Sequence, residues 1–392
     1  KDLYAYFYEK GLKILKPKGL MGLITPSSFL TNIGFISLRE LLIKYHIEYI
    51  IDLESNVFSD ASVDSSIVII HNTFSENQSI KCSGPNFVFK QINKELFRRL
   101  DSIIFNIYIN PNSLLLSDKI SNENKIFDDY INFSRGIEFG FKSEKVIKTK
   151  ESEDFKPLLC GGNISKYQIN FQNSYVKHDI NNSSIYKSSS IYENEKILVK
   201  RIGNTIIGCY DGNKYYNVCD VYNLQLKGKD NYSIKVINGI LNSRLINFYF
   251  DTKFKSLKKL FPKIPIQNLK LLPIPNFSNI NQNNLHNTVD LILKQNIQFV
   301  DCIKKFQRTL QRNFEIEPLP KKLQEWYLLT YNEFLKELSK NKVKLSLEDE
   351  GKWEDFFIQQ SELVNNIKDS IEKTNKEIDS MVYELYNLTD DE

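Results

Sequence analysis

Three segments near the start of the chain decide its fold: DLYAYFYEK (residues 2–10), KPKGLMGLITP (16–26) and VFSDASV (57–63). Apolar residues recur near helical spacing around the first segment, which predicts an amphipathic helix over residues 2–16 with Leu3, Phe7, Leu12 and Leu15 on its apolar side. Pro17 and Gly19 end this helix. The apolar run that leads to Thr25-Pro26 predicts a buried strand.

The rest of the first 75 residues extends this pattern. A second helix is predicted over residues 38–45, and β-branched runs predict strands over 47–53 and 66–71. The order helix, strand, helix, strand, strand predicts a parallel α/β sheet that ends in a hairpin-like edge. Three strands and two helices cannot cover both faces of such a sheet. We therefore expect exposed apolar faces, with more chain belonging upstream.

In order and spacing these segments resemble later motifs of the amino-methylating DNA methyltransferases, specifically the Taq-type adenine-N6 branch and the related type IIG restriction–modification enzymes. The resemblance implies that Phe7 lies near the adenine ring of S-adenosylmethionine and that Phe58 stacks on the flipped target adenine. A base removed from the duplex needs an aromatic face in place of its lost stacking, worth about 1–3 kcal/mol. From the residues alone, Phe7 could equally be a core residue of its helix.

Two motifs that this family needs for catalysis are missing from the sequence. The family needs a glycine-containing loop after its first strand and an Asn/Asp-Pro-Pro-Tyr/Phe motif, but the sequence has no Pro-Pro pair. Methyl transfer depends on positioning the cofactor and the target amine together. We therefore expect residues 1–392 alone to be inactive and to bind no cofactor. The intact parent would use S-adenosylmethionine, and Mg²⁺ only if it carries a nuclease domain.

Charge is distributed unevenly along the 392 residues. The formal net charge is only +4, yet residues 192–275 hold 14 Lys/Arg and 6 Asp/Glu, and residues 341–392 hold 6 Lys/Arg and 14 Asp/Glu. A basic middle accommodates a polyanion, whereas the acidic end suits a solvated surface or a partner face. The length predicts two or three domains, and an apolar content of 41% supports a real core.

The spacing of the cysteines and the hydropathy of the chain bear on disulfides, metal sites and membrane spans. The five cysteines show no paired metal spacing, so we expect reduced thiols in a cytoplasmic protein and no metal site. No apolar run approaches the roughly 18 residues of a membrane span.

The middle of the chain resembles the target-recognition domains of the same enzymes. The motifs are FSRGIEFGF (133–141), LLCGGNI (158–164) with Tyr167, and LLPIP (271–275) after LNSRL (241–245). Between them, strands are predicted over residues 197–202, 215–218 and 221–224, and a helix over 238–250.

Cations of this region are the candidate DNA contacts. Five lysines with no acid among them suit phosphate contacts: Lys253, Lys255, Lys258, Lys259 and Lys263. Arg135, Arg201 and Arg244 are better shaped for bidentate contact to guanine, and Lys200 precedes Arg201 at a strand end. Each lysine could also be an ordinary solvated residue, and Arg244, inside a helix, could pair with a carboxylate.

The C-terminal part carries heptad seams. Apolar residues follow alternating steps of four and three over residues 285–310 and 353–388, with a further helix over 321–338 between them. Asn296, Gln360 and Thr374 are polar seam positions that could fix register. The two long helices could pair within the chain or seat a partner subunit, and we favour pairing within the chain.

These observations predict a multidomain α/β plus α protein. It would hold the C-terminal half of a doubly wound methyltransferase sheet (residues 1–75), a connector (76–126), an α/β target-recognition domain (127–276) and a helical, coiled-coil-like region (277–392). The predicted function is DNA target recognition, plus part of the catalytic domain, in a site-specific adenine-N6 methyltransferase of a type II, IIG-like system that flips its target base. Partners would be double-stranded DNA and the upstream half of the same polypeptide. A non-enzymatic specificity subunit and a protein-interaction module without DNA binding are the alternatives.

Overall fold

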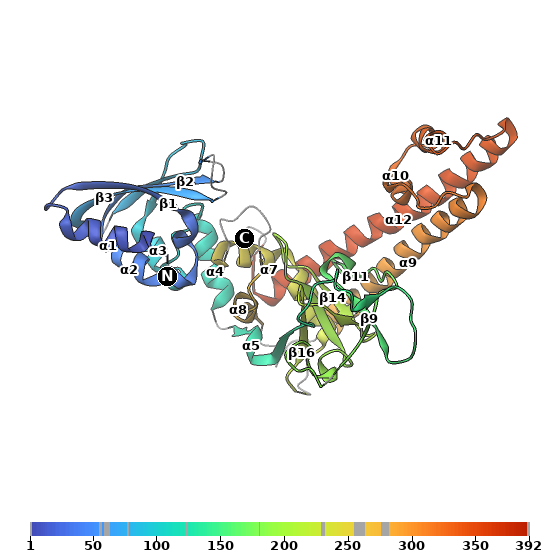
Figure 1. Cartoon of the computed structure of the whole chain (residues 1–392), viewed down its shortest axis with the longest axis horizontal. Coiled ribbons are helices and arrows are strands. Elements are labelled where there is room, and N and C mark those ends of the chain that lie inside the picture. The colour runs from blue at the N-terminus through green and yellow to red at the C-terminus, as the bar shows by residue number, and fades with distance from the viewer. Residues whose placement is uncertain are drawn as a thin grey trace. The chain divides into compact units, whose positions relative to one another are not determined.

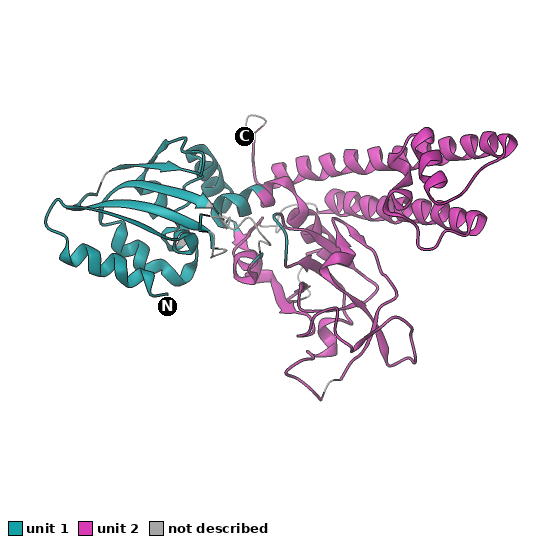
Figure 2. Ribbon diagram, turned by 45° about the horizontal axis from the view of Figure 1, so that its top comes forward, with its two compact units in different colours: residues 1–124, 202–204, 248–264 teal, residues 125–201, 205–247, 265–392 magenta. Residues whose placement is uncertain are grey.

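The computed structural model describes most of the chain: residues 2–54, 57–58, 63–76, 78–122, 124–179, 181–228, 232–254, 263–275 and 282–389. The chain divides into two compact units (Figure 2). Unit 1 comprises residues 1–124, 202–204 and 248–264, and unit 2 comprises residues 125–201, 205–247 and 265–392.

Unit 1 is built on a five-stranded sheet with the strand order β1-β3-β2-β4-β5. Its strands are β1 (Leu20–Pro26), β2 (Tyr45–Glu54), β3 (Ser65–Phe74), β4 (Ser79–Ser83) and β5 (Lys90–Asn93). β3 pairs antiparallel with both β1 and β2, so β1 and β2 run in the same direction with β3 between them. The predicted hairpin-like pair of β2 and β3 is confirmed. Adjacent parallel pairing instead occurs between β2 and β4.

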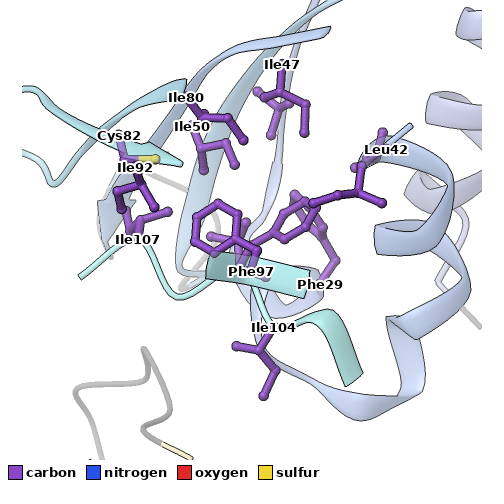
Figure 3. Close-up of a cluster of buried hydrophobic side chains, with 14 of the residues drawn as sticks. Phe29, Leu42, Ile47, Ile50, Ile80, Cys82, Ile92, Phe97, Ile104 and Ile107 are labelled. Carbon is purple, nitrogen blue, oxygen red and sulfur yellow. The ribbon is translucent and has the colours of Figure 1, made fainter. Parts of the chain in front are cut away.

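Helices cover one face of this sheet. They are α1 (Tyr4–Ile14), α2 (Ile36–Leu42), α3 (Lys94–Arg98) and α4 (Pro111–Ser121), with short 3-10 turns at Ser27–Leu30, Ile33–Phe35 and Asp101–Ile103. Figure 1 shows α1 and α2 on the same side of the strands. Their apolar residues share one core with the sheet, as Figure 3 shows for Phe29, Leu42, Ile50 and Phe97.

The face of α1 that enters this core differs from the predicted one. Tyr8 and Leu12 are buried, whereas Leu3 and Phe7 are exposed. The Tyr8 hydroxyl hydrogen-bonds Thr25 Oγ1 at 3.1 Å, so a tyrosine can take the inner position without leaving its polar atom unsatisfied. Tyr4 does the same with Ser28 at 2.9 Å. The side of α1 that carries Leu3 and Phe7 is therefore exposed to solvent.

Residues 76–126, expected as a connector, contribute β4, β5, α3 and α4 to unit 1. The polar stretch 74–84 looks like a linker in sequence, yet it contains β4, in which Ile80 and Cys82 are buried. Residues 93–105 form only the short α3 followed by a 3-10 turn.

The first part of unit 2 is mainly β. One four-stranded sheet has the order β14-β13-β16-β7 and a second has the order β15-β9-β12-β8. The strands are β7 (Ile131–Arg135), β8 (Val146–Ile147), β9 (Phe155–Leu159), β12 (Tyr175–Lys177), β13 (Lys196–Lys200), β14 (Gly208–Asp211), β15 (Tyr216–Asn217) and β16 (Val221–Leu226). The strands predicted over 197–202, 215–218 and 221–224 are thus present as β13, β15 and β16.

Smaller elements complete this part. Two-stranded pairs join β10 (Ile164–Ser165) to β11 (Gln168–Ile169) and β6 (Lys125–Ile126) to β17 (Pro273–Ile274). The helices are α5 (Phe127–Tyr130), α6 (Ile234–Asn242) and α8 (Ile266–Lys270), together with the start of α7 (Arg244–Phe254), whose residues from Phe248 onward belong to unit 1. Short 3-10 turns lie at Gly161–Asn163 and Ser189–Ile191. The single helix predicted over 238–250 is broken at Ser243, which is extended and whose hydroxyl accepts the Ile246 N–H.

The C-terminal part of unit 2 is a helical hairpin. α9 (Asn283–Phe314) and α12 (Leu347–Leu385) run side by side (Figure 1), joined by α10 (Lys321–Gln324), a 3-10 turn at Trp326–Leu328, and α11 (Tyr331–Lys340). The predicted seam is buried, and Phe306 stacks on Trp326 with ring centroids 3.7 Å apart. Pairing of the two long helices within the chain is confirmed. None of the described helices has the length and apolarity that a membrane crossing requires.

Candidate nucleic-acid interface

Two of the predicted arginines meet at one end of the β14-β13-β16-β7 sheet. β16 lies between β13 and β7, and its register pairs Tyr222 with Arg135. On the other side, the Arg201 N–H donates to the Asp220 carbonyl at 2.9 Å, just past the end of β13. Arg135 and Arg201 therefore flank the first residues of β16 from opposite sides.

Tyr222 connects the two arginines. Its ring is buried, and the Arg201 side chain hydrogen-bonds its hydroxyl. Burial raises the pKa of Tyr222, while the nearby charges of Arg201 and Arg135 act in the opposite direction. The phenol thus holds a guanidinium at the sheet end while remaining neutral itself.

Arg135 is held from its other side. Its Nη2 lies 3.2 Å from Glu138 Oε2, and its Nε is buried without a hydrogen-bond partner among the described residues. The next residue is Gly136, where a Cβ would lie 2.2 Å from the Asn217 carbonyl oxygen. The Arg-Gly pair of the sequence motif is therefore needed for the chain to pass β15 directly after the arginine.

Asp220 ties the LLCGGNI turn to the same place. Its Oδ2 accepts the Gly161 N–H at 3.1 Å. Burial raises the pKa of Asp220, and the hydrogen bond from Gly161 and the charges of Arg201 and Lys200 oppose that rise. Lys200 directly precedes Arg201, and successive side chains of a strand point to opposite faces, so the Lys200 side chain lies on the other face of the strand.

Sequence reasoning found Arg135, Lys200 and Arg201 but missed Tyr222, Glu138 and Asp220. The cations could be selected from the sequence because charged residues stand out beside apolar strand patterns and motifs. Their partners are ordinary residues whose importance comes from strand register, which no local pattern displays.

The other predicted cations have different surroundings. Arg244 is 75% exposed, with its Nε 3.6 Å from Asp379 Oδ2, so it pairs with a carboxylate as its helical position allowed. In unit 1, Lys253 is only 10% exposed and lies 2.7 Å from Asp118. Lys263 is exposed and forms an isolated antiparallel bridge with Ile202. Lys255, Lys258 and Lys259 lie outside the described residues.

The two predicted catalytic-domain aromatics are both exposed. Phe7 is 66% exposed on α1, and Phe58 is 48% exposed after β2. Neither belongs to the core of unit 1. Among the described residues, no group of three or more His, Cys, Asp or Glu is placed to hold a metal ion.

Comparisons with known proteins match three separate stretches of the chain. An Eco57I restriction-modification methylase family matches residues 1–58, a TaqI-like C-terminal specificity domain matches 156–274, and a domain of unknown function (DUF8810) matches 278–382. A Methanocaldococcus jannaschii protein named as a type II restriction enzyme and methyltransferase, RM.MjaORFECS2P, is 28% identical over 297 residues, which is 70% of this chain and 25% of that protein.

Similar solved structures include the type IIG restriction endonuclease BpuSI, at 13% identity and a TM-score of 0.35, over 98% of this chain and 49% of that chain. The type IIL restriction-modification enzyme MmeI, solved with DNA, is 10% identical with a TM-score of 0.47, over 99% and 52%. The chain thus spans a quarter of its curated relative and about half of these structures. The chain is thus similar to an Eco57I restriction-modification methylase family over residues 1–58 and to a TaqI-like C-terminal specificity domain over residues 156–274.

Proposed function

We propose that this chain recognises a short duplex DNA site for a type II restriction–modification methyltransferase that methylates adenine N6. The observation that carries the proposal is the convergence of Arg135 and Arg201 on Tyr222 at one end of a sheet, most of which lies in the TaqI-like specificity domain. Arginine is the side chain that reads guanine O6 and N7 together in the major groove. Holding both guanidinium groups in place before binding reduces the entropy lost on contact.

Phosphate contacts would supply most of the affinity around this centre. Lys200 and Arg244 of unit 2 are available for that role. Lys263 of unit 1 is a separate candidate for a phosphate contact, as are Lys255, Lys258 and Lys259 on sequence grounds. We leave Lys253 out of the proposed interface because its ammonium is largely buried against Asp118. Breaking that pair would cost more than a screened phosphate contact returns.

The catalytic part of the proposal assigns Phe58 to stacking on the flipped adenine and Phe7 to contact with S-adenosylmethionine. Both rings are exposed, as an aromatic contact to a ligand requires. The present residues nevertheless fit the cofactor only in part, because they offer one aromatic face and no glycine-rich loop after a strand. We derive no step of methyl transfer from them, and we expect this chain alone to be inactive.

The rest of the methylase would cover the apolar surface that unit 1 leaves open. Leu20 and Ile24 on the edge strand β1, and Leu3, Phe7 and Ile14 on α1, are all exposed large hydrophobic residues. The two groups are separate surfaces, because Met21 and Leu23, which alternate with Leu20 and Ile24 along β1, are the residues that pack against the core shared with α1. Exposed apolar surface marks an interaction site, and we propose the upstream methylase part as the partner for the open face of β1.

Binding selection from a randomised duplex pool tests the recognition role. Arg135→Ala and Arg201→Ala should each relax preference at particular base positions and cost about 1–3 kcal/mol on the preferred site. Lys336→Ala, an exposed cation on α11, is the matched control and should change neither affinity nor preference.

A NaCl titration of the same binding reaction separates the alternatives. A DNA-binding protein loses affinity steeply with salt because it releases condensed counterions. Wild-type binding without a salt slope or without sequence enrichment would favour a protein-interaction module and overturn the proposal.

A further inference from the structure

The side of α9 that faces away from its seam carries a row of polar residues at steps of four and three. All six are exposed, and we call them the α9 stripe: Lys294, Gln298, Asp301, Lys305, Arg308 and Arg312. Lys294 follows the buried Leu285 by about two and a half helical turns, so the stripe lies opposite the seam. It extends for about 27 Å along the helix axis.

The cations of the α9 stripe are not neutralised by the protein. Among the described residues, Lys294, Lys305, Arg308 and Arg312 have no ion-pair or hydrogen-bond partner. Asp301 precedes Lys305 by four residues, a favourable arrangement on a helix, yet the two side chains form no ion pair. A row of cations chosen only for solubility would be expected to alternate with acids.

The surface along the α9 stripe is hollowed. An open groove of 690 Å³ is lined by Lys294, Asp301, Lys305 and Arg308, with Ile297 and Cys302 among its apolar lining. A second hollow of 460 Å³ shares Lys305 and Arg308 and continues to Arg312. The cations thus border two shallow, open hollows that share Lys305 and Arg308.

Charge is segregated between the two helices of the hairpin. α9 carries five Lys/Arg and two Asp/Glu, whereas α12 carries four Lys and eleven Asp/Glu. α12 packs on the seam side of α9, so its acids cannot reach the stripe. The hairpin therefore presents a surface on α9 in which four cations outnumber the two carboxylates that line the same hollows, Asp301 and Glu317.

We infer that the α9 stripe binds the phosphate backbone of duplex DNA, as a contact surface additional to the specificity domain. Duplex DNA carries one negative charge per about 1.7 Å, so a row of cations about 27 Å long can meet several phosphates. Such contacts position the protein and read no bases. This inference rests on the proposed DNA-binding function of the chain, and it assigns a role to the spacer helices beyond holding the domains.

The test uses the full chain and a fluorescein-labelled duplex of mixed sequence, with anisotropy followed through a NaCl titration. K305E/R308E/R312E should weaken binding about tenfold or more, and the slope of log K against log salt should fall by about 3. Asp301→Lys should tighten binding. A gain of affinity cannot come from misfolding.

K368E/K373E/K376E on α12 is the matched control, because it changes the net charge equally at sites away from the α9 stripe. We expect it to leave the affinity within about threefold and the slope nearly unchanged. Light scattering on all variants monitors self-association.

The outcomes are distinct. If the stripe and control variants bind DNA alike, the inference is wrong while DNA recognition stands. The inference is also wrong if the stripe variant changes only the self-association seen by light scattering and leaves DNA binding unchanged. The stripe would then contact the acidic face of a second copy. If wild type shows no salt-dependent binding at all, the proposed function itself fails and the inference with it.

Discussion

Two buried lysines show how single residues in this chain meet the cost of burying a charge. Among the described residues, Lys94 in unit 1 has no carboxylate partner. Its Nζ donates to the carbonyls of Tyr45 and Ser75, and burial lowers its pKa to about 8. Lys196 in unit 2 lies 2.6 Å from Asp211, with both side chains fully buried. Burial lowers the pKa of Lys196, and Asp211 opposes that change.

We predict that Asp211→Asn costs about 3–5 kcal/mol of unfolding free energy, because it leaves the Lys196 ammonium buried without a counter-charge. Asp211 also accepts the N–H groups of Asn213 and Tyr215, so the turn that follows β14 depends on it too. Urea unfolding measures the change. Asp290→Asn, which breaks a pair with Lys235 of the same 2.6 Å length, is the control and should cost less than about 1 kcal/mol because that pair is partly exposed. Equal losses in the two variants would contradict the prediction.

For single residues, the sequence shows which positions are charged but not which residues face each other across paired strands. Arg201 could be proposed from the sequence because it ends a predicted strand, and Arg135 because it lies in the motif over residues 133–141. Their common partner Tyr222 could not, since the pairing of β16 with β7 comes from tertiary structure. The inner face of α1 was predicted wrongly for a related reason: Tyr8 is polar at its tip but apolar in its body, and only the position of Thr25 makes it the better core residue.

Among the elements, the long helices were the most predictable and the short strands the least. The seam of α9 and α12 repeats over many turns, so its periodicity outweighs local noise. β4 has only five residues in a polar stretch, and its parallel pairing with β2 is a non-local event. Asn296 is a polar seam position that was expected to fix the register of the two helices. Its amide donates to the Ile292 carbonyl of its own helix at 2.8 Å, and among the described residues it makes no hydrogen bond across the hairpin that would fix register.

We predict that Asn296→Leu raises the unfolding free energy by about 1 kcal/mol, because it replaces a buried amide in the seam with an apolar side chain. Thermal and urea unfolding measure this change, and light scattering shows whether the hairpin loses its specificity for pairing within the chain. Gln298→Leu, on the exposed side of the same helix, is the control and should shift stability by no more than about 0.5 kcal/mol. Destabilisation by Asn296→Leu would show that the amide is needed where it is.

On the scale of the whole molecule, the two units differ in how completely they bury their apolar surface. In unit 2, Ile240 and Leu241 of α6 and Leu245 and Ile246 of α7 are buried, as are most seam residues of α9. In unit 1, the described helices α1, α2 and α3 contribute to a core on one face of the sheet, while β1 stands at its edge with Leu20 and Ile24 exposed. The sequence predicted this imbalance from the number of strands and helices. It could not show which side chains would be left uncovered, because that depends on the position of β3 between β1 and β2.

We predict that Leu20→Lys/Ile24→Lys lowers binding of the dye ANS and reduces self-association of the chain, while the unfolding free energy changes by less than about 1 kcal/mol. Both side chains are exposed, so little native packing is lost, and the new charges remove apolar surface that now faces water. Dye fluorescence, light scattering and urea unfolding follow the three quantities. Leu291→Lys/Ile297→Lys on α9 has comparably exposed residues that belong to no sheet face, and it should leave dye binding nearly unchanged. If the β1 variant instead unfolds, these residues support unit 1 itself. If dye binding falls equally in both variants, the open face of the sheet is no special surface, and the proposed seat for the rest of the methylase is wrong.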